Sequence, residues 1–107
     1  MVRGSGELPW TLPLVDAEVG HALRGAVMRK HVRATRATLA LERLVQMPMI
    51  RTGHLSLASH AWQLRGNLSF YDALYVALAA KLGAPLVTLD ARLKNAPKLP
   101  AEVVLIY

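Results

Sequence analysis

The sequence predicts an α/β fold with three layers and a mainly parallel sheet. One observation is that segments with helical periodicity alternate with short apolar runs of the kind that form strands. A second is that the late runs, at residues 85–89 and 102–107, are nearly continuous in apolar residues, as in strands buried on both faces. A third is that residues 70–82 are apolar nearly all round, which predicts a helix buried by its neighbours.

Two helices and a strand are expected in the first half of the chain. Apolar residues recur at helical spacing over residues 14–27, directly after Pro13. A second helix is expected over about residues 35–45, because Pro48 disfavours helical backbone in the residue before it. Residues 49–51 then predict a short strand.

Two longer helices and one short helix are expected in the second half. Residues 55–65 have helical spacing and end at a Gly-Asn turn. Ser69 is placed to cap the helix at residues 70–82, and Gly83 stands where a left-handed C-terminal cap is needed. Residues 91–94 predict a short helix after the first of the late strands.

The composition indicates a folded domain and limits its chemistry. The chain has 107 residues, of which 53% are apolar, and a mean hydropathy of +0.28, which suits one domain over residues 1–107. It contains no cysteine, so a metal would be bound through oxygen or imidazole ligands. The sequence shows neither a leader-like apolar region nor a run long enough to span a membrane, so a cytoplasmic location is expected.

The chain is basic, with a net charge of +6 from 13 Lys and Arg against 7 acids. This balance favours a polyanionic partner such as nucleic acid. Arg24, Arg65 and Arg92 are candidates for contacts with phosphates, with solvated or ion-paired roles as the alternative. A cluster of bases around the first turn between helices is also explained by a solvated face. Its members are Arg24, Arg29, Lys30, Arg33 and Arg36.

Three acids occupy positions that a structural role does not fully explain. Glu18 lies on or beside the apolar face of the first helix, with snorkelling to water or an ion pair with Arg as the alternative. Asp72 is in the first turn of the most apolar helix, where helix capping also explains it. Asp90 follows the strand at residues 85–89, at the end where α/β sheets bind ligands, or it caps the turn that follows.

Together the three acids predict a metal site. Clustered carboxylates repel one another unless a divalent cation neutralises them. Oxygen ligands suit Mg²⁺ or Mn²⁺. On a basic protein such a site indicates phosphodiester hydrolysis, in which the ion activates water and stabilises charge on the phosphate. Glu18, Asp72 and Asp90 are therefore the candidate catalytic and metal-binding residues.

The segments around these acids carry a further observation. In chain order they are Leu14-Val15-Asp16-Ala17-Glu18-Val19, Ala22-Leu23-Arg24, Ala61-Trp62-Gln63-Leu64-Arg65, Asn67-Leu68-Ser69-Phe70-Tyr71-Asp72-Ala73 and Leu86-Val87-Thr88-Leu89-Asp90-Ala91-Arg92-Leu93. In sequence and spacing they resemble the PIN domain of VapC-type toxins. The resemblance runs from about Leu8 to the C-terminus.

The resemblance implies a bacterial toxin–antitoxin ribonuclease that cuts structured RNA with Mg²⁺ or Mn²⁺. It also implies silencing by a cognate VapB-type antitoxin and, in many members, a homodimer. Matched to the family, Glu18 is its conserved glutamate, Asp72 the aspartate of its Tyr-Asp-Ala segment, and Asp90 the aspartate after the late strand. Ser69 matches a Ser/Thr position near the same site.

The beginning of the chain departs from this pattern. Members of the family open with a hydrophobic strand that ends in an aspartate, whereas only 17 residues precede Glu18 and none resembles that strand. Asp16 is a poor substitute, because it is two residues from Glu18 on the same helix and points elsewhere. Since that strand is central in the family's sheet, we expect either a misassigned start or a degenerate remnant. A genuine short form is expected to be poorly soluble or dimeric and to bind metal weakly.

Two other functions fit the sequence. A catalytically inactive PIN remnant would keep a surface that binds the antitoxin or RNA without turnover. A phospho-acceptor domain of the receiver type also uses an acidic trio on an α/β sheet. It needs a lysine after the late strand, where this chain has Ala91-Arg92-Leu93-Lys94 in a short helix.

Overall fold

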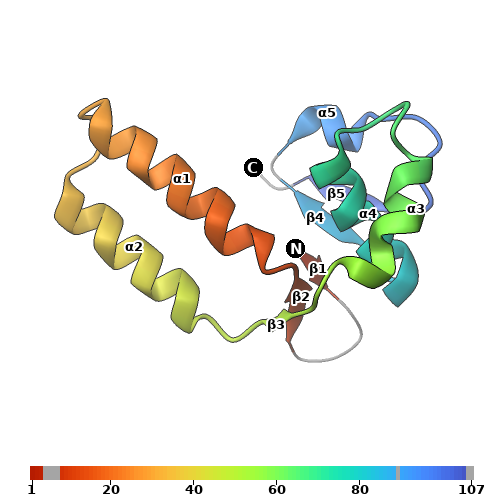
Figure 1. Ribbon diagram of the computed structural model, residues 1–107, viewed down its shortest axis with the longest axis horizontal. Helices are drawn as coiled ribbons and strands as arrows, with labels where there is room; N and C mark the ends of the chain where they lie inside the picture. Colours follow the sequence, from red (N-terminus) through yellow and green to blue (C-terminus); the bar gives the residue numbers. More distant parts are fainter. Residues whose placement is uncertain (4–7, 89, 106–107) are drawn as a thin grey trace. The chain divides into compact units, whose positions relative to one another are not determined.

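The computed structural model describes residues 1–3, 8–88 and 90–105 (Figure 1). The described residues form two compact units, and each is considered by itself. The sheet unit comprises Met1–Leu12 and Met49–Tyr107, and the hairpin unit comprises Pro13–Pro48.

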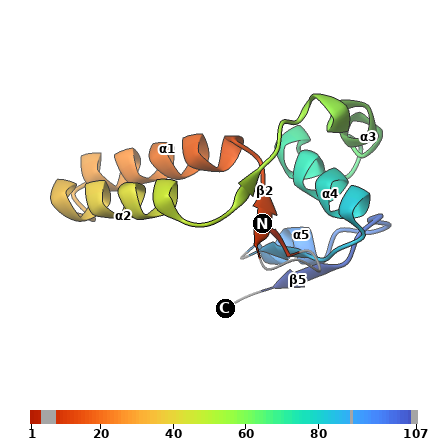
Figure 2. The same cartoon turned by 90° about the horizontal axis from the view of Figure 1, so that it is seen from below.

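The hairpin unit consists of two helices that lie side by side in both views (Figures 1 and 2). α1 spans Leu14–Met28 and α2 spans Ala34–Gln46, close to the ranges expected from the sequence. Lys30 helps to reverse the chain between them, with its backbone in the left-handed region at φ 61°. Within residues 13–48, all of which are described, Ala37 is the only buried residue. The apolar surface of this hairpin is therefore half-buried or exposed.

The sheet unit contains five short strands among the described residues. They are β1 (Val2–Arg3), β2 (Pro9–Thr11), β3 (Ile50–Arg51), β4 (Leu86–Thr88) and β5 (Val103–Leu105). They form one mixed sheet in the order β3-β2-β1-β4-β5. The pairs β2–β3 and β4–β5 are parallel, whereas β1 is antiparallel to both of its neighbours. The α/β class predicted from the sequence is confirmed, with parallel pairs on each side of the central strand.

Strands β3, β4 and β5 lie in the three segments that the sequence predicts to be strands. The expected ends of the last two, Leu89, Ile106 and Tyr107, lie outside the described residues. The two strands before α1 were not predicted, because β1 and β2 are too short to show an apolar pattern.

β1 occupies the centre of the sheet. Val2 is fully buried there and pairs with Trp10 on one side and Leu86 on the other. The connection from β1 to β2 is too short for a parallel crossover, which needs about a dozen residues or more, so the two strands are antiparallel. β1 consists of Val2 and Arg3 and contains no acid. It therefore does not supply the aspartate with which the family's opening strand ends.

Among the described residues of the sheet unit, helix α4 contributes more buried residues than any other element. It spans Phe70–Leu82, as predicted, and packs against β1, β4 and α3. The sequence predicted that this nearly uniformly apolar helix is buried by its neighbours, and six of its residues are buried. They are Ala73, Leu74, Val76, Ala77, Leu78 and Ala79.

The other helices of the sheet unit are short. The single helix expected over residues 55–65 is divided into a 3-10 helix, η1 (Leu55–Leu57), and α3 (Ala58–Gln63). Such tight turns are common at helix N-termini. The expected short helix is α5 (Ala91–Lys94), which packs against β4 and β5. In the part of the chain that the structure describes, no helix is long and apolar enough to cross a membrane.

Gly83 provides a test of the α4 terminus. It adopts a left-handed conformation at φ 61°, and its backbone N–H donates to the Ala80 carbonyl. We expect Gly83→Ala to lower the free energy of unfolding by about 1–2 kcal/mol, because an L side chain is strained in this region. Gly53→Ala is the matched control, since a Cβ there meets nothing within 4 Å and the backbone φ is not positive. Equal losses for both variants in urea denaturation would contradict this account of the cap.

Candidate functional site

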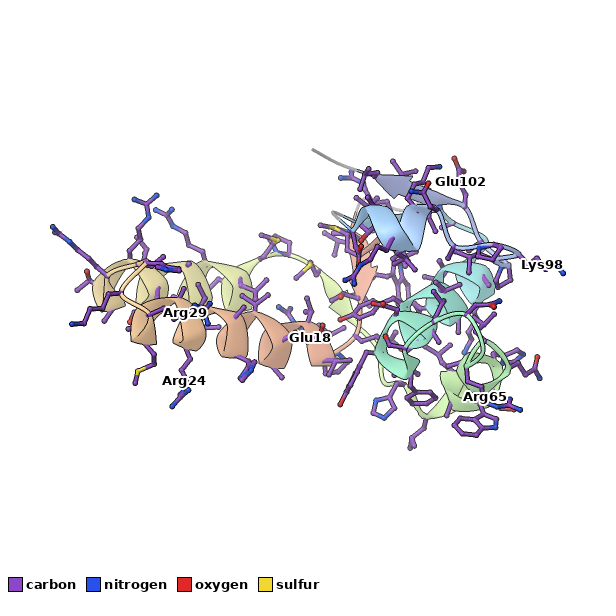
Figure 3. All side chains as sticks on the ribbon, turned by 90° about the horizontal axis from the view of Figure 1, so that it is seen from above. Glu18, Arg24, Arg29, Arg65, Lys98 and Glu102 are labelled. Atoms are coloured by element: carbon purple, nitrogen blue, oxygen red, sulfur yellow. The ribbon has the colours of Figure 1, made fainter. Side chains whose placement is uncertain are left out.

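Of the three predicted site acids, Glu18 belongs to the hairpin unit. It lies on α1 and is exposed, and Figure 3 shows it near the start of that helix. Its expected position on or beside the apolar face of the helix stays a prediction, and α1 contains no buried residue. Arg24 follows further along α1 and is also exposed (Figure 3).

Asp72 lies in the first turn of α4, in the sheet unit. Its backbone N–H donates to Ser69 Oγ at 3.1 Å, so Ser69 is the N-cap predicted from the sequence. In a full capping box, the Asp72 carboxylate would also accept from the Ser69 backbone N–H. Among the described residues that return hydrogen bond is not formed. The Ser69 hydroxyl therefore makes the described cap, and Asp72 itself is half-buried.

Asp90 lies in the sheet unit, shortly after β4 and directly before α5. Its backbone N–H donates to Thr88 Oγ1 at 3.1 Å, while Asp90 Oδ1 accepts from the Arg92 backbone N–H at 2.9 Å. Arg92 Nε contacts the same oxygen at 3.4 Å. The hydrogen bond from the Arg92 backbone is the main cause that lowers the pKa of the Asp90 carboxyl, and the Arg92 side chain adds to it. Asp90 is thus both the predicted cap of α5 and an ionised carboxylate at neutral pH.

Thr88 is a positioning residue that the sequence prediction missed. Its hydroxyl orients the backbone of Asp90 from the last position of β4. A Thr two residues before an acid at a strand end is a recognisable pattern, because Ser and Thr hydroxyls accept from backbone N–H groups nearby.

The other predicted RNA-binding residues are exposed. Arg92 exposes 94% of its side chain, despite its contact with Asp90. Arg65 stacks over the Trp62 ring at 4.8 Å from the centroid, and its Nη1 donates to the Trp62 carbonyl at 3.0 Å. Arg65 is therefore held in place by local contacts, while its guanidinium stays at the surface (Figure 3).

The donors in the sheet unit suit a hard divalent cation. Asp72 is at the start of α4 and Asp90 follows β4, and these two elements pack against each other. One or two carboxylates are enough for Mg²⁺, which keeps several waters and completes its shell with substrate phosphates. Within residues 1–3, 8–88 and 90–105 there is no group of three or more His, Asp or Glu residues that could hold a metal ion. Asp72 and Asp90 are oxygen donors of the kind that Mg²⁺ and Mn²⁺ accept.

Substitutions can separate the two properties of Asp90, which are its cap on α5 and its negative charge. Asn caps a helix about as well as Asp but carries no charge. Ala neither caps the helix nor carries a charge. We expect Asp90→Ala to unfold at a lower urea concentration than Asp90→Asn, because only the Asn variant keeps a side-chain cap on α5.

The lowered pKa of Asp90 sets the direction of a pH effect on stability. Its ionised form contributes stability above the pKa of an unfolded aspartate, and this contribution is lost as pH falls through the lower pKa of the folded state. Denaturation curves across acidic pH should therefore show a smaller acid effect in Asp90→Asn than in the parent chain. Identical pH profiles would contradict this role of the Arg92 contacts.

Comparison with known proteins adds independent information. The family model described as "PIN domain" matches residues 4–99. "Ribonuclease VapC1" of Mycobacterium tuberculosis is 50% identical over 94 residues, which cover 87% of this chain and 71% of that protein. "VapC ribonuclease Mb0985" of Mycobacterium bovis is 34% identical over 93 residues, covering 87% and 73%. "Ribonuclease VapC12" of Mycobacterium tuberculosis is 34% identical over 91 residues, covering 85% and 70%.

Proposed function

This chain belongs to the PIN domain family, and from that premise we propose that it is a metal-dependent endoribonuclease, the toxin of a VapBC-type toxin–antitoxin pair. The observation that carries the proposal is the 50% identity to a protein named "Ribonuclease VapC1" over 87% of the chain. The acids in the Tyr-Asp-Ala segment and after β4, Asp72 and Asp90, support it.

In this proposal Asp72 and Asp90 of the sheet unit hold Mg²⁺ or Mn²⁺. Glu18 is proposed as a site residue through its match to the family's conserved glutamate. The bound ion would supply an activated water and stabilise negative charge on the phosphate. Ser69 keeps the start of α4 in place, so that the Asp72 carboxylate is presented at the first turn. Two hydrogen bonds orient Asp90: its backbone N–H donates to Thr88 Oγ1, and its Oδ1 accepts from the Arg92 backbone N–H. Asp72 and Asp90 are thus each positioned by local hydrogen bonds.

The proposed partners follow from charge and family. A net charge of +6 attracts RNA, and the exposed Arg24, Arg65 and Arg92 would contact its phosphates. A VapB-type antitoxin would silence the toxin, and a homodimer is the proposed assembly.

A cleavage assay tests the proposed activity. The purified chain should cut total RNA in the presence of Mg²⁺ or Mn²⁺ and stop when EDTA removes the metal. Adding a cognate VapB-type antitoxin should also stop cleavage. Cleavage that continues unchanged in EDTA would contradict a metal-dependent mechanism.

A second candidate is a binding module without turnover. Two observations favour it: β1 contains no acid, and the described residues contain no group of three possible metal ligands. This reading predicts that the chain binds its antitoxin or RNA with normal affinity, while no cleavage is detected at any metal concentration. Cleavage by the parent chain that is lost in Asp72→Asn would exclude it.

A further inference from the structure

The sheet unit contains an apolar pocket that the proposed ribonuclease function does not use. It lies between α3, the C-terminal half of α4 and the loop before β5, and has a volume of about 590 Å³. Its lining includes the buried residues Leu57 and Ala77 and the half-buried Leu64. Its size falls within the range of about 300–1,000 Å³ that is common for small-molecule sites.

The charged groups at this pocket are both cationic. Lys81 and Lys98 line it together with His60, and none of the described lining residues is acidic. Lys81 Nζ donates to Ser56 Oγ at 3.3 Å, which holds the ammonium group at the rim. The carbonyls at the end of α4 carry partial negative charge, and Lys81 in the last turn offsets it. An anionic head group would therefore be attracted, whereas an amine would be repelled.

Lys98 carries a second feature. Its backbone has φ 55°, in the left-handed region that a residue with a Cβ rarely adopts. Such a conformation costs free energy and is common at ligand sites. Figure 3 shows Lys98 on the loop between α5 and β5. The loop thus holds a strained residue at the position where it supplies a positive charge to the pocket.

The pocket is separate from the acids of the candidate site. Lys81 lies about 14 Å along the α4 axis from Asp72, given the rise of an α-helix. Ala77, Ala80 and Lys81 line the pocket from the C-terminal half of α4, whereas Asp72 is in its first turn. A ligand in the pocket would therefore occupy the opposite end of the same helix.

We infer that this pocket binds a small amphipathic anion, with an apolar body against Leu57, Leu64 and Ala77 and an anionic head between Lys81 and Lys98. The apolar body gains by leaving water, and the head gains charge-assisted contacts with two ammonium groups. The head is a carboxylate or a phosphate, because a compact lysine ammonium attracts either one.

Calorimetric titration of the full chain tests this inference. The probes are decanoate and decyl phosphate, kept below the concentrations at which they form micelles, with decylamine and decanol as matched controls. We expect at least one of the anions to bind saturably at one site, and the tighter of the two identifies the head group. Decylamine and decanol should bind at least tenfold more weakly. No saturable binding of either anion, or equal binding of decylamine, would overturn the inference.

Substitutions locate the site. The double variant Lys81→Gln with Lys98→Gln should weaken binding of the anion at least tenfold, while Lys94→Gln, an exposed lysine that does not line the pocket, should leave it unchanged. Ala80→Trp fills the pocket from an exposed position and should abolish binding while circular dichroism shows an unchanged fold. Undiminished binding by either folded variant would overturn the inference, so the test does not depend on one variant folding.

Discussion

Asp72→Asn lowers the rate of metal-dependent RNA cleavage by about 100-fold or more, which is the first of the two largest effects that we expect. The carboxylate is not needed to cap α4, because Ser69 Oγ accepts from the backbone N–H of residue 72, and this bond is kept in the variant. The loss of a negative charge at a helix N-terminus costs only about 0.3–1 kcal/mol. Loss of a residue that only orients a metal ligand lowers activity by about 10- to 100-fold. Loss of the proposed ligand itself should lower activity more. Activity should therefore fall far more than stability.

The control for Asp72→Asn is Glu42→Gln, which removes the same charge from an exposed position on α2. Single-turnover cleavage of a labelled RNA and urea denaturation should be measured on both variants. We expect Glu42→Gln to match the parent chain in both assays. Parent-like cleavage by Asp72→Asn would remove Asp72 from the proposed site and leave it a purely structural residue of the α4 terminus.

The second large effect concerns the core. Leu78→Ala should lower the free energy of unfolding by about 2–5 kcal/mol, because it removes a large apolar side chain and leaves a cavity. Leu78 exposes 2% of its surface in the middle of α4, where neighbouring residues Ala77 and Ala79 are also buried. Such a loss is a large part of the stability of a small domain, so the thermal midpoint should fall clearly.

Leu55→Ala is the matched control for Leu78→Ala. Leu55 begins η1 in the same unit and is 87% exposed, so the same substitution should change the free energy of unfolding by no more than about 0.5 kcal/mol. Urea denaturation followed by circular dichroism measures both. Similar losses for the two variants would show that α4 is not the core of this unit.

Local chemistry explains how the two predicted acids of the sheet unit are held. Asp72 and Asp90 were predicted as site residues from their positions at a helix start and after a strand. At these positions the Asp72 N–H donates to Ser69 Oγ, and Asp90 Oδ1 accepts from the Arg92 backbone N–H. Thr88 was missed because its role depends on the turn that brings its hydroxyl to the Asp90 backbone. Glu18 was expected on or beside the apolar face of α1, and no residue of α1 is buried. Helical periodicity shows which side of a helix is apolar, and it does not show whether anything covers that side.

The sequence by itself determined the elements whose signals are local. The apolar composition of residues 70–82 predicted α4, and its two ends were marked by Ser69 and Gly83. Runs rich in β-branched residues predicted β4 and β5. Tertiary structure alone decided the centre of the sheet. β1 is only Val2–Arg3, so it carries no pattern of its own, and it is a strand because β2 and β4 offer hydrogen bonds and bury Val2 between them. Its direction follows from the short connection to β2, a constraint of chain length and not of residue type.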